Sequence, residues 1–198
     1  MKYDIILCGV GGQGVLSVAA LIGRAAAAEG LQVKQSEVHG MSQRGGAVMA
    51  HLRFADHPVA SDLIPQAGAD LILSMEPMES LRYVGYLAAE AALVTATEPF
   101  KNIPDYPELD TVLAAIRRLP HSLLVDAAKL ADEAGNPVAV NTVMVGAASR
   151  LLPFRADTLE KVVREMFSAK GVKVVEMNLK ALELGRRAYA ASSHTCTA

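Results

Sequence analysis

The 198-residue sequence has only two cysteines and no tryptophan. Cys8 lies in an apolar run near the start, and Cys196 lies near the end. An iron–sulfur cluster needs about four cysteine thiolates, and a structural zinc site about four closely spaced Cys or His ligands. We therefore expect no metal site and no cofactor held by this chain alone. Cysteines so far apart also do not form a disulfide framework, which favours a reducing, cytoplasmic compartment.

The chain also has little net charge and no long apolar run. Lys and Arg number 19 against 21 Asp and Glu, for a net charge of −2. Such a chain has no overall positive field to attract nucleic acid or an anionic membrane surface. The most apolar stretches are interrupted at Arg24 or at Asn141 and Thr142, before the roughly 18 residues of a spanning helix. We predict neither nucleic acid nor membrane as a partner.

Hydrophobic residues make up 52% of the chain, enough for the core of a single domain over residues 1–198. Short apolar runs predict strands at 3–8, 31–36, 47–54, 70–74, 92–96 and 122–125. Helical patterns occur at 15–29, 78–89, 111–119, 139–152, 158–169 and 174–191. The alternation predicts an α/β fold with a doubly wound, mostly parallel sheet over residues 1–135. Residues 136–198 are predicted to form a mainly helical C-terminal part.

A glycine-rich segment connects the first predicted strand to the first predicted helix. Gly9, Gly11 and Gly14 have the G-x-G-x-x-G spacing of Rossmann-like folds, with Gly12 and Gln13 between them. Glycines permit a tight turn there, and unpaired N–H groups at a helix N-terminus favour an anion. The segment therefore predicts a binding site for a phosphate or carboxylate group. The structural alternative is that these glycines bind no ligand and only let the helix pack close to the sheet.

A second polar segment follows the second predicted strand. A dinucleotide-binding fold has an acidic residue about 20 positions after the glycine motif, and Glu37 nearly fits, so a free-standing NAD-type protein is one hypothesis. The loop predicted from Glu37 to Gly46 is richer in donors and glycines than such a fold needs. Its candidate ligand-binding residues, with the preceding Ser36, are His39, Gln43, Arg44, Gly45 and Gly46. Because open α/β sheets bind ligands at the carboxyl edge, we predict that both segments form one site.

Two side chains of this loop suggest specific chemistry. The planar guanidinium of Arg44 can bind a carboxylate or phosphate through two parallel hydrogen bonds, although an intersubunit salt bridge explains it equally well. Because an imidazole group titrates near neutral pH, His39 is a possible catalytic residue for proton transfer. A histidine that merely hydrogen-bonds a backbone carbonyl is the alternative for His39.

The two glycine segments together carry a family resemblance. The stretches GVGGQGV and SEVHGMSQRGGAVMAHLR, followed by DLILSMEPMESLR, resemble the gamma-type subunits of 2-oxoacid:ferredoxin oxidoreductases. Within that family the chain is most similar to the small, or beta, subunits of indolepyruvate:ferredoxin oxidoreductases. NTVMVG at 141–146 and VEMNLKALELG at 175–185 extend the resemblance over nearly the whole chain.

The resemblance implies a subunit of a complex that oxidatively decarboxylates an aryl 2-oxoacid, joins the acyl group to coenzyme A and passes electrons to ferredoxin. It implies that thiamine diphosphate and iron–sulfur clusters reside in a large partner subunit, and that this chain completes the active site and the subunit interface. The lack of a Gly-Asp-Gly thiamine motif and the two distant cysteines agree with this division. An interaction subunit without its own ligand remains a further alternative.

Overall fold

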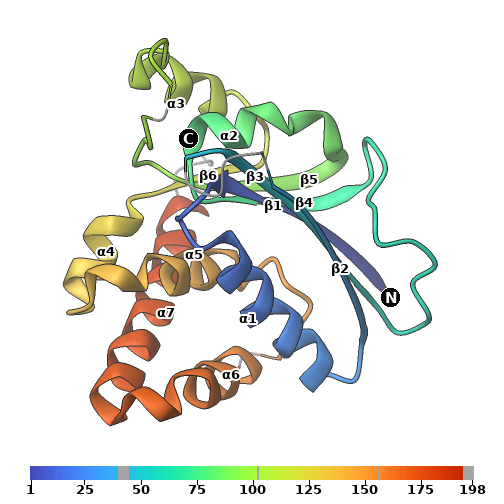
Figure 1. The fold of residues 1–198 in the computed structure, drawn as a ribbon, viewed down its shortest axis with the longest axis vertical. Helices are drawn as coiled ribbons and strands as arrows, with labels where there is room; N and C mark the ends of the chain where they lie inside the picture. The colour runs from blue at the N-terminus through green and yellow to red at the C-terminus, as the bar shows by residue number, and fades with distance from the viewer. Residues whose placement is uncertain (40–44, 102, 156, 194–198) are drawn as a thin grey trace.

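The computed structural model describes residues 1–39, 45–101, 103–155 and 157–193. They form a six-stranded sheet with the strand order β2-β3-β1-β4-β5-β6 (Figure 1). The strands are β1 (Lys2–Val10), β2 (Gln32–His39), β3 (Ala47–Ala55), β4 (Ala69–Ser74), β5 (Leu87–Ala96) and β6 (Ser122–Val125).

Most of the described strands run in one direction. β1 pairs in parallel with β4, β4 with β5, and β5 with β6. β3 is antiparallel to both of its neighbours, β1 and β2, so β2 runs in the same direction as β1. The reversal of β3 follows from the short connection over residues 40–46, because a parallel crossover needs a dozen or more residues. The prediction of a mostly parallel α/β sheet is confirmed.

Helices cover both faces of this sheet, as expected for a doubly wound fold (Figure 1). The segments are α1 (Val15–Ala28), α2 (Pro77–Arg82), η1 (Val84–Tyr86), α3 (Leu109–Arg117), α4 (Ala127–Glu133), η2 (Pro137–Ala139), α5 (Val140–Ala148), α6 (Thr158–Phe167), η3 (Ser168–Lys170) and α7 (Val172–Ser193). α2 and α3 lie on one face, and α1 lies on the other with α4 to α7. None of the described helices is long and apolar enough to cross a membrane.

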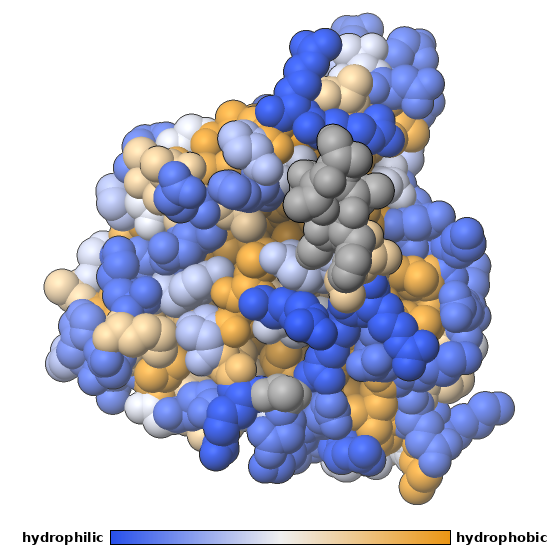
Figure 2. Space-filling model, turned by 180° about the vertical axis from the view of Figure 1, so that it is seen from behind, coloured by the Kyte–Doolittle hydropathy of each residue, from blue (hydrophilic) through white to orange (hydrophobic). Residues whose placement is uncertain are grey.

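The strand β1 lies in the middle of the core. Ile5 and Leu7 belong to the larger apolar cluster on the α1 face, whereas Ile6 and Cys8 belong to the smaller cluster beneath α2 and α3. Burial on both faces explains the continuous apolar run that predicted this strand. Burial also raises the pKa of the Cys8 thiol to about 12, so this cysteine serves as a small core side chain. Seen from behind the view of Figure 1, the molecular surface has apolar patches between polar residues (Figure 2).

Two helices differ from the sequence prediction. The helix predicted over 78–89 ends at Arg82, and residues from Leu87 onward belong to β5. Between them the chain forms the short turn η1, and Tyr83 and Tyr86 pack against the apolar cluster beneath α2 and α3. The short helix α4 was not predicted. It begins after Asp126, whose side chain accepts a hydrogen bond from the Lys129 N–H at 3.3 Å.

The helices α5 and α7 cross with their backbones in contact. A Cβ atom at Gly146 would lie 2.1 Å from the Leu182 carbonyl oxygen, and one at Gly185 would lie 2.0 Å from the Val143 carbonyl oxygen. Real Cβ contacts do not occur at such distances. Only glycine at these two positions therefore lets α5 and α7 pack this closely.

We predict that Gly185→Ala lowers the free energy of unfolding by about 1–3 kcal/mol or more, because the added methyl group must push α7 away from α5. Gly23→Ala in α1 is the matched control, since its added Cβ would have its nearest contacts at 3.7 and 3.8 Å. That substitution should be neutral or stabilise by up to about 1 kcal/mol through helix propensity. Urea unfolding of the full chain measures both. Equal effects of the two substitutions would contradict the close contact.

Candidate functional site

The glycine-rich segment forms a turn at the carboxyl edge of the sheet, between β1 and α1. Gly12 and Gly14 have positive φ angles of 107° and 79°. A Cβ atom at Gly14 would also lie 2.2 Å from the side-chain nitrogen of Asn141. That nitrogen donates a hydrogen bond to the Gly14 carbonyl at 3.3 Å, so α5 packs directly on the turn. Both conformation and close approach therefore require glycine at position 14.

The side chain of Gln13 closes the turn. Its oxygen accepts a hydrogen bond from the Val10 N–H at 2.8 Å, and its nitrogen donates one to the Met75 carbonyl at 3.1 Å. A Cβ atom at Gly9 would lie 3.0 Å from the same Gln13 oxygen, so Gly9 leaves room for this side chain. Gln13 thus ties the turn to the residue after β4. Its suggested role in orienting a ligand stays a prediction.

The second glycine segment lies next to this turn. The Gly11 N–H donates to the Gly46 carbonyl at 2.8 Å, and the Gly45 N–H donates to the Gly11 carbonyl at 3.2 Å. The backbones of the two segments are therefore joined by two hydrogen bonds. Gln43 and Arg44 lie outside the described residues.

Part of the predicted polar loop belongs to a strand. Glu37 and His39 continue β2, because their pairing with β3 extends to Val48. His39 therefore ends the strand near the glycine turn, since Val48 also pairs with Gly9. Ser36 instead pairs with a residue in the middle of β3. It lies three positions, or about 10 Å, before His39 along β2. The structure does not bring Ser36 to the turn.

This arrangement also tests the dinucleotide hypothesis. A ribose-binding acid belongs at the end of the strand next to β1, beside the glycine turn. Here the antiparallel strand β3 separates β2 from β1. With about 4.8 Å between neighbouring strands, the β2 backbone at Glu37 is roughly 10 Å from β1. Glu37 therefore does not occupy the ribose-binding position.

A cavity of about 360 Å³ lies against the N-terminus of α1. Its lining combines the turn residues Gly12, Gln13 and Gly14 with Met75, Ala96, Glu98, Ala128, Val138, Val140 and Asn141. The volume is within the usual range of ligand sites, and its walls are mostly apolar with few polar groups. The helix N-terminus at one wall favours an anionic group of a ligand.

Glu98 is a polar group of this cavity that the sequence analysis missed. It follows β5, and its side-chain oxygen accepts a hydrogen bond from the Ala128 N–H at 3.2 Å. Burial raises the pKa of Glu98, and a hydrogen bond with the Asp126 carboxyl raises it further. A carboxyl group that retains its proton more readily can act as a proton donor beside an anion site. The sequence contained one signal for this residue, because an acidic side chain soon after a buried apolar strand lies at the ligand-binding edge of the sheet.

Comparison with known proteins identifies the family. The family model described as pyruvate ferredoxin/flavodoxin oxidoreductase matches residues 4–188. The chain belongs to this family.

Curated relatives narrow the assignment within the pyruvate ferredoxin/flavodoxin oxidoreductase family. Indolepyruvate oxidoreductase subunit IorB of Archaeoglobus fulgidus is 39% identical over 196 residues, which cover 93% of this chain and 94% of the relative. The subunit of the same name from Pyrococcus horikoshii is 39% identical over 197 residues, which cover 94% and 96%. The resemblance found in the sequence is confirmed, and the chain is an IorB-like subunit of a 2-oxoacid:ferredoxin oxidoreductase.

Solved structures share the fold. The gamma subunit of a keto/oxoacid ferredoxin oxidoreductase from Geobacter sulfurreducens matches with a TM-score of 0.69 and 24% identity, covering 96% of this chain and 99% of that one. The 2-oxoglutarate:ferredoxin oxidoreductase from Magnetococcus marinus, solved with 2-oxoglutarate, coenzyme A and succinyl-CoA, has a TM-score of 0.75 and 21% identity. The match covers 96% of this chain but 31% of that one. Partner subunits are implied for this family member.

We predict that Gln13→Met in this oxidoreductase subunit lowers the free energy of unfolding by about 1–3 kcal/mol, because the Val10 N–H loses its acceptor. Gln35→Met, at an exposed position of β2, is the matched control and should change stability little. Urea unfolding measures both variants. A Gln13→Met variant as stable as the control would show that the turn does not depend on this side chain.

We predict that Glu98→Gln stabilises the fold at neutral and higher pH. The folded pKa of Glu98 lies above its ordinary value of 4.5, so ionisation costs stability as the pH rises through the folded pKa. Glutamine removes that cost and keeps an acceptor for the Ala128 N–H. Thermal unfolding should therefore show a gain at about pH 8 that vanishes below about pH 4. The exposed Glu165→Gln in α6 is the control, and a gain independent of pH would contradict the raised pKa.

Proposed function

We propose that this chain is the small subunit of an indolepyruvate, or aryl 2-oxoacid, ferredoxin oxidoreductase. In this reaction an aryl 2-oxoacid is oxidatively decarboxylated, its acyl group is joined to coenzyme A, and electrons pass to ferredoxin. The observation that carries the proposal is the 39% identity to two indolepyruvate oxidoreductase subunits over nearly the full length of each chain.

The iron–sulfur clusters and thiamine diphosphate are assigned to a large partner subunit. Among the residues that the structure describes, no group of three Cys, His, Asp or Glu side chains is arranged to hold a metal ion. The described residues therefore do not fit an iron–sulfur cluster, which needs about four cysteine thiolates. Because the chain has only two cysteines, the redox chemistry is assigned to the partner and binding groups to this chain.

The binding groups of this chain are assigned to the carboxyl edge of the sheet. The N-terminus of α1 offers backbone N–H groups to an anion, which is the carboxylate of the oxoacid or a phosphate of coenzyme A. Met75, Val138 and Val140 give the cavity an apolar side for the uncharged part of that ligand. Glu98, whose pKa is raised by burial, also lines this cavity. His39 and Arg44 remain candidates for proton transfer and anion binding.

The proposal is tested with the chain co-purified with its large subunit. Reduction of a viologen dye should require both indolepyruvate and coenzyme A. A complex that turns over pyruvate or 2-oxoglutarate but no aryl 2-oxoacid would overturn the assigned substrate. Saturable NAD binding by this chain alone, lost in Glu37→Ala, would instead support the dinucleotide hypothesis.

Arg44→Ala is predicted to raise the KM for the oxoacid or for coenzyme A at least about tenfold, the effect of losing one charge-assisted hydrogen bond. The control is Arg117→Ala at the exposed end of α3, which should leave both KM values unchanged. Steady-state kinetics of the assembled complex measures both. Unchanged KM values in an intact Arg44→Ala complex would exclude a binding role for this residue.

A further inference from the structure

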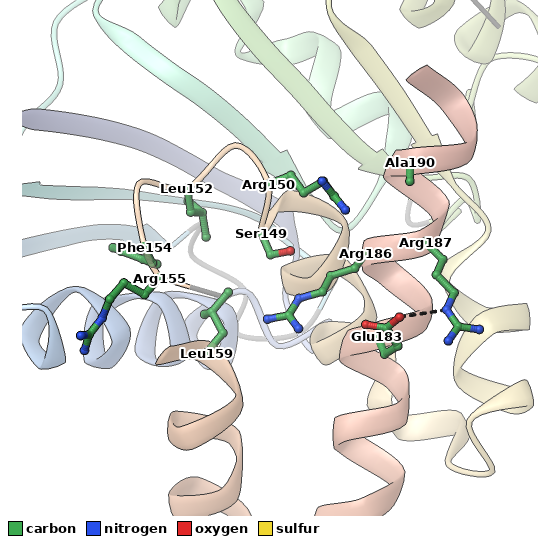
Figure 3. Close-up of a pocket in the computed structure, with 10 residues that line it drawn as sticks. All are labelled: Ser149, Arg150, Leu152, Phe154, Arg155, Leu159, Glu183, Arg186, Arg187 and Ala190. Atoms are coloured by element: carbon green, nitrogen blue, oxygen red, sulfur yellow. Dashed lines mark hydrogen bonds and ion pairs between the residues drawn. The ribbon is translucent and has the colours of Figure 1, made fainter. Parts of the chain in front are cut away.

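A second cavity, of about 500 Å³, lies between the segment after α5 and the helix α7 (Figure 3). Arg150 and Arg155 line it from the segment after α5, and Arg186 and Arg187 line it from α7. These are four of the eleven arginines in a chain whose net charge is −2. Glu183 is the one carboxylate in the described lining. The cavity is therefore locally positive on a chain that is weakly negative overall.

Acidic residues compensate only part of this charge. Arg187 pairs with Glu183 at 2.9 Å, and Arg186 pairs with Glu160 at 2.6 Å. Arg155 pairs with Glu29 at 3.5 Å. Arg150 makes no ion pair or hydrogen bond with any described residue. The cavity thus keeps an excess of guanidinium groups over carboxylates.

The floor of the cavity is apolar. Leu152 and Leu159 are 5% and 2% exposed, and Phe154 packs on Phe54 with 5.2 Å between ring centroids. Figure 3 shows the Arg186 side chain extending from α7 across the cavity toward Leu159, while Arg155 and Arg187 lie at its two sides. Such a cavity suits a ligand with a charged group and a small apolar part.

We propose that this cavity binds a phosphate group, either as free phosphate or as the phosphate monoester of a small organic molecule. A phosphate dianion has several acceptor oxygens that match the planar fork of a guanidinium, and arginine is the usual partner where such recognition occurs. Arg150 supplies the uncompensated guanidinium, and the half-buried Arg186 supplies the most fixed one.

This site is separate from the glycine-turn cavity. Phe154 lies beneath Phe54, near the end of β3, where β3 pairs with the first residues of β1. The arginine cavity therefore lies at the amino edge of the sheet, and the glycine turn lies at the carboxyl edge. The proposal does not depend on the function assigned to the carboxyl edge.

Titration calorimetry of the full chain with inorganic phosphate and with phenyl phosphate tests the proposal. Both ligands should bind saturably, and Arg150→Gln should weaken each at least about tenfold. Tighter binding of phenyl phosphate than of inorganic phosphate assigns the site to a monoester, and equal binding assigns it to free phosphate. Added salt should weaken binding, because the arginines are solvent-accessible.

Two control variants sharpen the result. Arg117→Gln at the end of α3 should bind phosphate like the unmodified chain. Glu183→Gln should bind phosphate more tightly, because the substitution removes a negative charge that repels the phosphate. No saturable binding, or equal binding by Arg150→Gln and the unmodified chain, overturns the proposal. If Arg150→Glu instead prevents co-purification with the large subunit and phosphate does not bind, the cavity is a protein contact and the proposal is wrong.

Discussion

The backbone contact between α5 and α7 at Gly146 and Gly185 holds together the two helices that pack beneath the sheet, and α5 reaches toward both cavities. α5 has nine residues and spans about 14 Å. Near one end of α5, the Asn141 side chain donates a hydrogen bond to the Gly14 carbonyl and lines the cavity at the glycine turn. Just beyond the other end, Arg150 lines the cavity beneath α7. A wider separation of α5 and α7 would widen the arginine cavity, because residues after α5 and residues of α7 line its opposite sides.

The two cavities differ in the source of their positive potential. At the glycine turn it comes from backbone N–H groups at the N-terminus of α1, with the Glu98 carboxyl nearby and mostly apolar walls. In the other cavity it comes from guanidinium groups that are partly paired with carboxylates. Overall charge and composition could not distinguish these cases, because both sources are local. The net charge of −2 excludes only a chain-wide field.

Local patterns predicted most of the elements. The strand at 122–125 and the helix starting at Val15 agree with the structure because each has a short-range signal: an apolar run, or a glycine turn followed by helix formers. The helix predicted from Met78 to Ala89 ends early because residues from Leu87 onward pair with β4 as part of β5, a long-range contact that overrides local helix propensity. No local pattern shows that β3 lies between β1 and β2, which removed Glu37 from the dinucleotide position.

By itself, the sequence determined the glycine turn, the buried strand before it, the α/β class and the family, because glycine spacing and apolar runs act on neighbouring residues. Only the tertiary structure decided what those parts do together. Gln13 finds its second partner at the Met75 carbonyl, 62 residues away. Arg150 and Arg186 line one cavity because α7 packs against α5, where two glycines let the backbones touch. Such contacts join residues far apart in the chain, so they follow from packing and strand order and leave no local trace in the sequence.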